Sequence, residues 1–172
     1  LDRALLDEVM GSEGADPDTT EAIDEVLAGR RGTAPSRRAR NGDELSALID
    51  RAGGVTVPEA RDRVADQSLW TRGDPLTELL ESHRVVEIEV PTATGAARRL
   101  ILTETFGRYA SAFGLDAASI VRAGVDLAER AAADVVPAPL REPALRRGAA
   151  AREVLARWLA LSGPVSVEEI RA

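Results

Sequence analysis

The chain has 172 residues and a formal net charge of −7 at neutral pH, which is room for one domain or two small ones. It contains no cysteine, one histidine and no lysine, so disulfides, thiolate metal sites and a lysine-dependent phosphate-binding loop are excluded. The negative net charge also weakens the overall electrostatic attraction of the protein to the phosphates of a nucleic acid, so any such contact must come from a local cluster of arginines. No apolar run approaches the roughly 18 residues of a membrane span.

Two helices are expected in residues 1–28. The first has apolar residues at helical spacing over residues 1–10, and the second begins at Asp16, just before Pro17. Nine acidic residues against one arginine make this segment acidic, as is typical of a solvated helix face. The apolar face of the second helix consists of Ile23, Val26 and Leu27.

Residues 29–42 form the most basic stretch of the chain and are predicted to be a loop or linker, because Gly, Thr, Pro and Ser punctuate them and acids are absent before Asp43. Two interpretations stay open: the arginines contact nucleic-acid phosphates, or they neutralise the preceding acidic helices. Residues 1–42 are therefore one region of acidic helices and an Arg-rich linker. The candidate phosphate contacts are Arg37, Arg38 and Arg40, with Arg30 and Arg31 in the same cluster.

The stretch from Asp43 to Glu104 follows the order of a winged helix, with three helices before two short strands. Val55 is expected to form a one-bridge strand that pairs with the wing. Thr56 and Glu59 have the spacing of a capping box for the second helix. The expected helices are 43–52, 58–64 and 74–84, and the expected strands are 85–90 and 98–102. The winged-helix-like domain also includes the helix that follows the strands, and it spans residues 43–114.

The first strand alternates Val86, Ile88 and Val90 with Glu87 and Glu89, which predicts a half-buried strand with both carboxylates on its wet face. The third helix is acidic on its exposed side, which argues against direct base reading by that helix in the major groove. Better phosphate candidates around the domain are Arg72, Arg98 and Arg99.

After the hairpin the chain is expected to be helical with one extended, Pro-rich interruption. Helices are predicted from Thr103 to Phe113, ended by Gly114, and over residues 115–136. Both tryptophans are expected to be buried rather than available for base stacking. These tryptophans are Trp70 and Trp158. The Pro-rich interruption is expected at 137–143 and the last helix at 145–161. As regions, 115–144 is expected to be a connector, and 145–172 the first part of a second winged helix.

A shift of 110 residues aligns residues 48–61 with residues 158–171, so that Gly, Val, Val, Glu and Arg coincide and Ser166 replaces Thr56. Both copies combine a helix-ending glycine, a short β-branched segment and a capping-box pair. Tandem winged helices are expected, and two unrelated helix-turn-helix corners are the alternative. The fold class is thus mainly α with a small β-hairpin: a winged-helix domain, a helical connector and the start of a second winged helix. Because the repeat is incomplete, we expect a fragment of a longer protein.

No catalytic, cofactor-binding or metal site is readable in the sequence. Patterns for a phosphate-binding loop, a dinucleotide fold and a nucleophile elbow are absent. The single histidine, His83, ends an apolar helix beside Arg84 and is expected to be structural or solvent-facing. The carboxylates follow helix and strand surfaces and do not converge.

Four stretches of the chain carry a family resemblance. They are Ser36–Leu45 with its arginines, LLESHRVVEIEV from Leu79 to Val90, the helix Leu102–Gly114, and Arg157–Ser166. Together they resemble the region that follows the motor in large Lhr-type ATP-dependent helicases, although Ser162 and Val165 stand where that family often has His and Phe. The resemblance implies a parent that hydrolyses ATP with Mg and translocates on single-stranded DNA, through motor motifs that lie outside this chain.

These observations lead to the hypothesis of a non-catalytic accessory region that guides DNA, without a cofactor of its own. The resemblance implies that its partner is the remainder of the parent helicase, an ATP hydrolase of the cytoplasm that acts in DNA repair. Single-stranded DNA binding and oligomerisation stay open. The alternative is a protein-docking or oligomerisation module with no nucleic-acid role, whereas a small transcriptional regulator is disfavoured by the acidic third helix.

Overall fold

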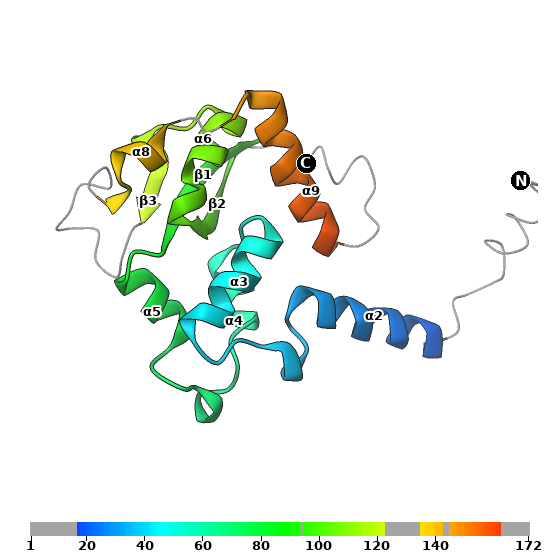
Figure 1. The fold of residues 1–172 in the computed structure, drawn as a ribbon. Helices are drawn as coiled ribbons and strands as arrows, with labels where there is room; N and C mark the ends of the chain where they lie inside the picture. The colour runs from blue at the N-terminus through cyan, green and yellow to red at the C-terminus, as the bar shows by residue number, and fades with distance from the viewer. Residues whose placement is uncertain (1–16, 94, 123–134, 143–144, 163–172) are drawn as a thin grey trace, which may run out of the picture.

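The computed structural model describes residues 17–93, 95–122, 135–142 and 145–162, which are mostly helical around a small sheet (Figure 1). In chain order the helices and strands are α2 (Pro17–Arg31), α3 (Gly42–Ala52), α4 (Val57–Asp62), α5 (Pro75–Glu81), β1 (Val85–Thr92), β2 (Gly95–Leu102), α6 (Phe106–Phe113), β3 (Ile120–Arg122), α8 (Ala138–Arg141) and α9 (Arg147–Ser162), with 3-10 turns at Pro35–Arg37, Gln67–Leu69, Thr103–Thr105 and Ala117–Ser119.

The three-helix unit expected from the sequence is confirmed. Each helix begins at a side chain that accepts a hydrogen bond from a free main-chain N–H group of the first turn. Asn41 does this for α3 across 2.9 Å, and Thr56 and Glu59 form the predicted capping box of α4. Asp74 caps α5 in the same way. Gly53 ends α3 at φ +65°, in the left-handed conformation that favours glycine.

A three-stranded antiparallel sheet follows the helices, with the strand order β2-β1-β3. β1 and β2 pair along all eight residues of each strand. Val55 adds an isolated bridge to β2 through two main-chain hydrogen bonds with Leu100, of 3.0 and 2.6 Å. The one-bridge strand is therefore confirmed, and helix, bridge, two helices and hairpin complete the order of a winged helix.

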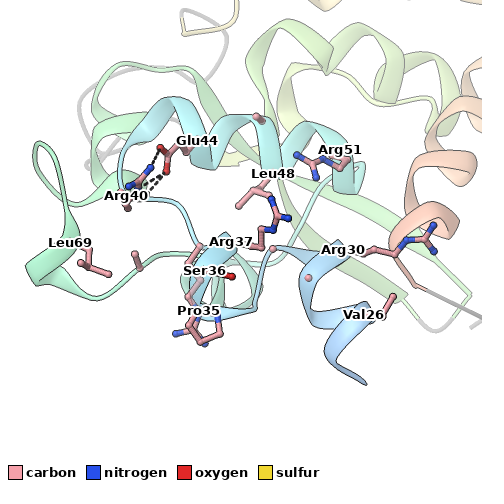
Figure 2. A pocket seen from close by; sticks show the side chains of 15 residues that line it. Val26, Arg30, Pro35, Ser36, Arg37, Arg40, Glu44, Leu48, Arg51 and Leu69 are labelled. Atoms are coloured by element: carbon pink, nitrogen blue, oxygen red, sulfur yellow. Dashed lines mark hydrogen bonds and ion pairs between the residues drawn. The ribbon is translucent and has the colours of Figure 1, made fainter. Parts of the chain in front are cut away.

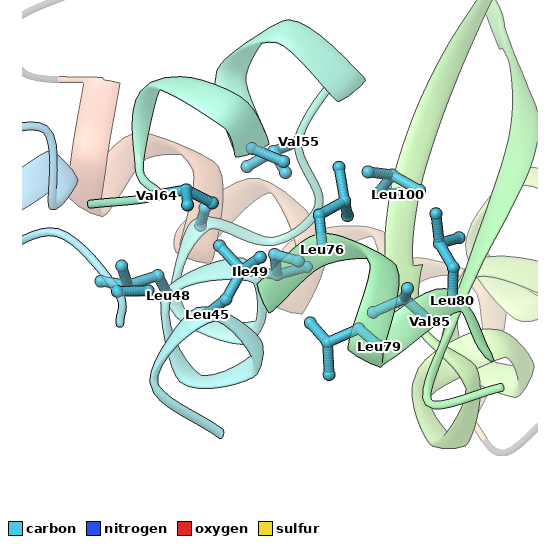
Figure 3. Close-up of a cluster of buried hydrophobic side chains, with 13 residues drawn as sticks. Leu45, Leu48, Ile49, Val55, Val64, Leu76, Leu79, Leu80, Val85 and Leu100 are labelled. Atoms are coloured by element: carbon cyan, nitrogen blue, oxygen red, sulfur yellow. The ribbon is translucent and has the colours of Figure 1, made fainter. Parts of the chain in front are cut away.

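One face of the sheet packs against the three helices (Figure 3). Leu45 and Ile49 of α3 and Leu76 and Leu79 of α5 are fully buried, beside Leu100 of β2. Fully burying a side chain of this size contributes about 1.5–3 kcal/mol. This cluster therefore supplies much of the free energy that holds the winged helix together.

The opposite face of the sheet is covered by a second helical layer. Val86, Ile88 and Ile101 are buried there against Phe106 and Tyr109 of α6. In turn, α9 packs on α6 and on α3. The hairpin is thus the middle layer between two groups of helices rather than a freely projecting wing.

The expectation that Glu87 lies on a wet strand face is wrong. Glu89 is exposed, but Glu87 is only 9% exposed. β3 pairs with the edge of β1 that β2 leaves free, and this makes β1 the central strand. The prediction missed β3, because a strand of three residues is too short to show an alternating pattern.

Other boundaries also differ from the predictions. The segment 115–136, expected to be helical, contains β3, and residues 123–134 lie outside the described residues. The Pro-rich interruption contains the short helix α8, and α2 continues through Gly29 to Arg31, so the predicted linker begins later. The last helix is confirmed as α9, but 163–172 lie outside the described residues, and the second winged helix stays a prediction.

The tryptophans and the apolar face of α2 are less buried than expected. Trp70 is half-buried and its indole N–H donates to the carbonyl of Ala65 at 2.9 Å. Trp158 is also half-buried. Ile23 and Val26 are 52% and 62% exposed, so the expected apolar face of α2 is uncovered within the described part of the chain.

Candidate nucleic-acid interface

An open groove of about 870 Å³ lies between the C-terminal part of α2, the following turn and α3 (Figure 2). We call it the arginine groove, because arginines line it against a single carboxylate, that of Glu44. Apolar side chains, among them Val26, Leu48 and Leu69, line the remainder. The arginines are Arg30 of α2, Arg37, Arg38 and Arg40 of the turn, and Arg51 of α3.

The turn between α2 and α3 is held by main-chain hydrogen bonds and is not a loose linker. Buried Ala39 forms a parallel bridge with Val64, in which its N–H donates to the carbonyl of Arg63 across 2.7 Å and its carbonyl accepts from the N–H of Ala65 across 2.8 Å. Gly32 has φ +74° and lies so close to Leu48 that a Cβ would come within 2.7 Å of that side chain. The backbone thus fixes the arginines of the turn opposite α3.

The charges in the arginine groove divide into paired and unpaired groups. Arg40 forms an ion pair of 3.1 Å with Glu44 and also donates its main-chain N–H to that carboxylate at 2.9 Å. These hydrogen bonds lower the pKa of Glu44. Arg38 donates its Nε to the carbonyl of Thr33 at 2.8 Å, which orients its side chain.

Three further arginines of the groove carry exposed guanidinium groups. Arg30, Arg37 and Arg51 have neither an ion pair nor a side-chain hydrogen bond to any residue that the structure describes. Guanidinium groups bind phosphate through paired N–H donors. An anion in the groove would therefore meet three cations that no described carboxylate already neutralises.

The structure brings together only half of the arginines predicted as phosphate contacts. Arg37, Arg38 and Arg40 share the groove, whereas the others lie elsewhere. Arg72 pairs with Glu78 at 3.2 Å. The two wing arginines, Arg98 and Arg99, are neighbours in β2 and so point to opposite faces of the sheet.

Of the two wing arginines, Arg98 is exposed and lies opposite Glu89 in the strand register. Arg99 forms an ion pair of 3.2 Å with Glu59 of α4. The wing therefore presents one exposed arginine rather than the pair that the sequence suggested.

The helix α5, which takes the place of a base-reading helix, is acidic and short. It has seven residues. Glu78 accepts a hydrogen bond from the main-chain N–H of Gly42 at 3.0 Å, so its carboxylate fixes the start of α3. Glu81 is exposed. Carboxylates on this surface repel phosphates. That α5 does not read bases stays a prediction.

Sequence reasoning missed Arg51 as part of the candidate site and left Arg30 among the linker arginines without assigning it a contact. A signal for Arg51 was present in the spacing. Glu44, Ala47, Leu48 and Arg51 follow the i, i+3, i+4, i+7 pattern of one helix face, and all four line the groove. Only the position of the preceding turn shows that this face is open.

Nowhere in the described ranges do three or more His, Asp or Glu side chains gather as metal ligands would. Within the same ranges, no helix has the length and apolarity to cross a membrane. His83 adopts φ +54° at the turn before β1, and its carbonyl accepts a hydrogen bond from Thr103 at 2.6 Å.

The fold defines a winged-helix domain with a second helical layer. The sequence matches the family described as Large helicase-related protein, winged-helix domain, over residues 18–129. This match covers more than half of the chain, so the chain belongs to the winged-helix domain family of the Large helicase-related protein, Lhr. No curated protein and no solved structure matches the chain.

Proposed function

We propose that this chain is a non-catalytic accessory region of an Lhr-like DNA helicase that guides a DNA strand along the arginine groove by its phosphates. The observation that carries the proposal is a set of exposed arginines in one groove that form no ion pair with any described residue, in a chain whose net charge is −7. These arginines are Arg30, Arg37 and Arg51. Concentrating free cations in one place creates a local attraction for phosphates that the overall charge opposes.

Contact through phosphates fits guidance better than sequence recognition. Phosphate contacts position a nucleic acid and carry no direct sequence information, which comes from base edges. α5 presents Glu78 and Glu81 where a base-reading helix would present donors. We therefore expect affinity that depends on salt and hardly on sequence.

The partner that follows from family membership is the remainder of the parent helicase. ATP and Mg would belong to the motor of that parent, and this chain would neither bind nor hydrolyse ATP. A turnover assay with the 172-residue chain tests this part: we expect no phosphate release above the protein-free rate. Release that scales with protein concentration and survives repurification would contradict it.

The DNA proposal is tested by the anisotropy of a labelled thymidine oligonucleotide at low salt. Replacing both Arg37 and Arg51 by Ala removes two of the unpaired cations and should weaken binding on the order of tenfold. The matched control replaces Arg147 and Arg152, two exposed arginines of α9, and changes the net charge by the same amount. Equal losses in both variants would show that overall charge, and not the groove, sets the affinity.

A second candidate is a protein-docking module, and the exposure of Ile23 and Val26 on the acidic helix α2 favours it. Uncovered apolar side chains on a charged helix are typical of surfaces that bind a partner. If this candidate holds and the first does not, the oligonucleotide will not bind at any salt concentration. The Ile23→Ser and Val26→Ser variant would then lose association with the parent protein.

A further inference from the structure

Arg63, at the end of α4, is a buried arginine that forms no ion pair with any carboxylate of the described residues. Its side chain and backbone are together only 7% exposed. Its Nη1 donates to the main-chain carbonyl of Glu59 at 2.6 Å, and its Nε is buried and has no hydrogen-bond partner in the described part of the chain. Buried charges in proteins are normally paired, because removing them from water is costly.

Two carboxylates act on Arg63 through their charge, those of Glu59 and Asp62, and the carboxylate of Glu59 is engaged by other groups. One of its oxygens accepts hydrogen bonds from the main-chain N–H and the hydroxyl of Thr56, at 2.7 and 3.0 Å, and also from Arg99 at 3.2 Å. Glu59 thus serves the capping box and the wing rather than Arg63. Burial lowers the pKa of Arg63, which is the direction expected of a cation that lacks a close counter-ion.

Arg63 lines a cavity of about 360 Å³ that lies apart from the arginine groove. Arg31 and Arg99 line the same cavity, as do Thr33 and the acidic residues Glu59 and Asp62, so three arginines and two carboxylates share it. α9 contributes Trp158 and Leu161 to its wall, and Arg31 donates to the carbonyl of Leu161 at 3.1 Å. The cavity is thus open to solvent and is lined by residues of α2, α4, the wing and α9 together.

We infer that this cavity is an anion site that binds a phosphate group, with Arg63 as its central ligand. The guanidinium group of Arg63 offers five N–H donors in a fixed fork, and one hydrogen bond to a described residue leaves donors free. A phosphate supplies several acceptor oxygens and enough negative charge for a buried cation flanked by two more arginines. This site is independent of the arginine groove and does not rest on the function proposed for it.

The phosphate group has two possible sources, free phosphate and the backbone of a nucleic acid, and one experiment distinguishes them. The ¹⁵N-labelled chain is titrated with inorganic phosphate, and separately with a short thymidine oligonucleotide, at constant ionic strength set by chloride. The arginine Nε–H resonances are followed. We expect a saturable shift of the Arg63 resonance with inorganic phosphate. If the oligonucleotide shifts the same resonance, the site also accepts a strand, and if it does not, the site is specific for a small anion.

Two variants test whether the side chain of Arg63 binds the phosphate that causes the resonance shift. Arg63→Met removes the charge and keeps the apolar stem, and it should weaken phosphate binding by at least about tenfold. Its melting temperature in phosphate-free buffer should equal or exceed that of the wild type, because an unpaired buried cation is gone. Arg61→Met is the control, since Arg61 is exposed on the same helix and pairs with Asp74.

The outcomes that would overturn the inference are equally definite. An Arg63 resonance that does not respond to phosphate in the wild type refutes the site whatever the variants do. So does an Arg63→Met chain that binds phosphate as tightly as the wild type. A lower melting temperature of Arg63→Met, together with a wild type that phosphate does not stabilise, would show that Arg63 only caps α4 through the carbonyl of Glu59.

Discussion

Arg157 of α9 holds α3 by two contacts to one residue, Asp50. Its Nη1 donates to the main-chain carbonyl of Asp50 at 2.9 Å and forms an ion pair with the carboxylate of the same residue. The carbonyl lies in the last turn of α3, where main-chain oxygens lack the usual partner of a helix interior, and it also accepts from the N–H of Gly53 at 3.1 Å. A cation at this end also interacts favourably with the helix dipole. The second helical layer is thereby joined to the winged helix.

Replacing Arg157 by Ala should lower the free energy of unfolding by about 1–2 kcal/mol, since it removes a charge-assisted hydrogen bond from a helix end. We expect the loss of stability to lie at the lower end of this range, because the side chains of Arg157 and Asp50 are both partly exposed and water screens their ion pair. Urea unfolding measures it, with Arg152→Ala as the control, because Arg152 is an exposed arginine of the same helix. Equal stabilities of the two variants would mean that α9 does not depend on this contact.

Gly53 tests the same junction from the side of α3. A Cβ at Gly53 would lie 2.9 Å from the Cβ of Arg157, and the residue has φ +65°. Gly114 has a similar φ of +73° but no atom within 4 Å of its would-be Cβ. Gly114→Ala should therefore cost only the left-handed strain, about 1 kcal/mol, whereas Gly53→Ala should cost clearly more. If both substitutions lower the melting temperature equally, α9 does not pack on Gly53 in solution.

The stability of the chain should depend on pH through Asp74. Burial raises the pKa of Asp74, but hydrogen bonds from Arg61 and Thr77 outweigh this, and the net shift is downward. A lowered pKa in the folded state means that the stabilisation is present above the unfolded pKa of about 3.9 and is lost as the pH falls below it.

Asp74→Asn keeps a capping side chain but removes the charge. It should therefore be less stable than the wild type at pH 7, and the difference should shrink as the pH falls from 5 to 2. Urea unfolding at several pH values measures this difference. A difference that is independent of pH would show that the charge of Asp74 contributes nothing to folding.

The exposed carboxylate of α5 should act on DNA binding only through its charge. Glu81→Gln removes one repulsive charge and should raise the affinity for oligonucleotides slightly and by the same factor for every sequence. Competition among oligonucleotides of different sequence checks this. A change in the order of preference among sequences would mean that α5 contacts bases after all.

The sequence was sufficient to predict the winged helix, because each of its boundaries has a local chemical signal. Three helix starts have a side chain that accepts a hydrogen bond from a nearby main-chain N–H group, and one helix end has a glycine in the left-handed conformation. The starts are at Asn41, at Thr56 with Glu59, and at Asp74, and the end is at Gly53. The apolar faces of α3 and α5 follow the helical period closely enough to identify the first core cluster. Local signals of this kind do not depend on the rest of the fold.

The second layer and the complete groove could not be predicted in this way, because they depend on contacts between distant segments. Arg157 reaches Asp50 across 107 residues, and the buried Glu87 lies in a strand whose second edge pairs with the three-residue strand β3. Arg51 belongs to the candidate site because the turn after α2 is bridged to Val64. The first two relationships leave no periodic trace in the sequence, and the helical spacing of Arg51 does not show that its face is open.

The most direct test of the proposed function is the salt dependence of oligonucleotide binding. Each phosphate contact to a single strand contributes about 0.7 to the slope of log affinity against log salt concentration. Replacing Arg30, Arg37 and Arg51 together by Ala should therefore reduce that slope by about 2, while the Arg147 and Arg152 control should leave it unchanged. A triple variant with the slope of the wild type would contradict the assignment of the arginine groove as the surface that contacts DNA.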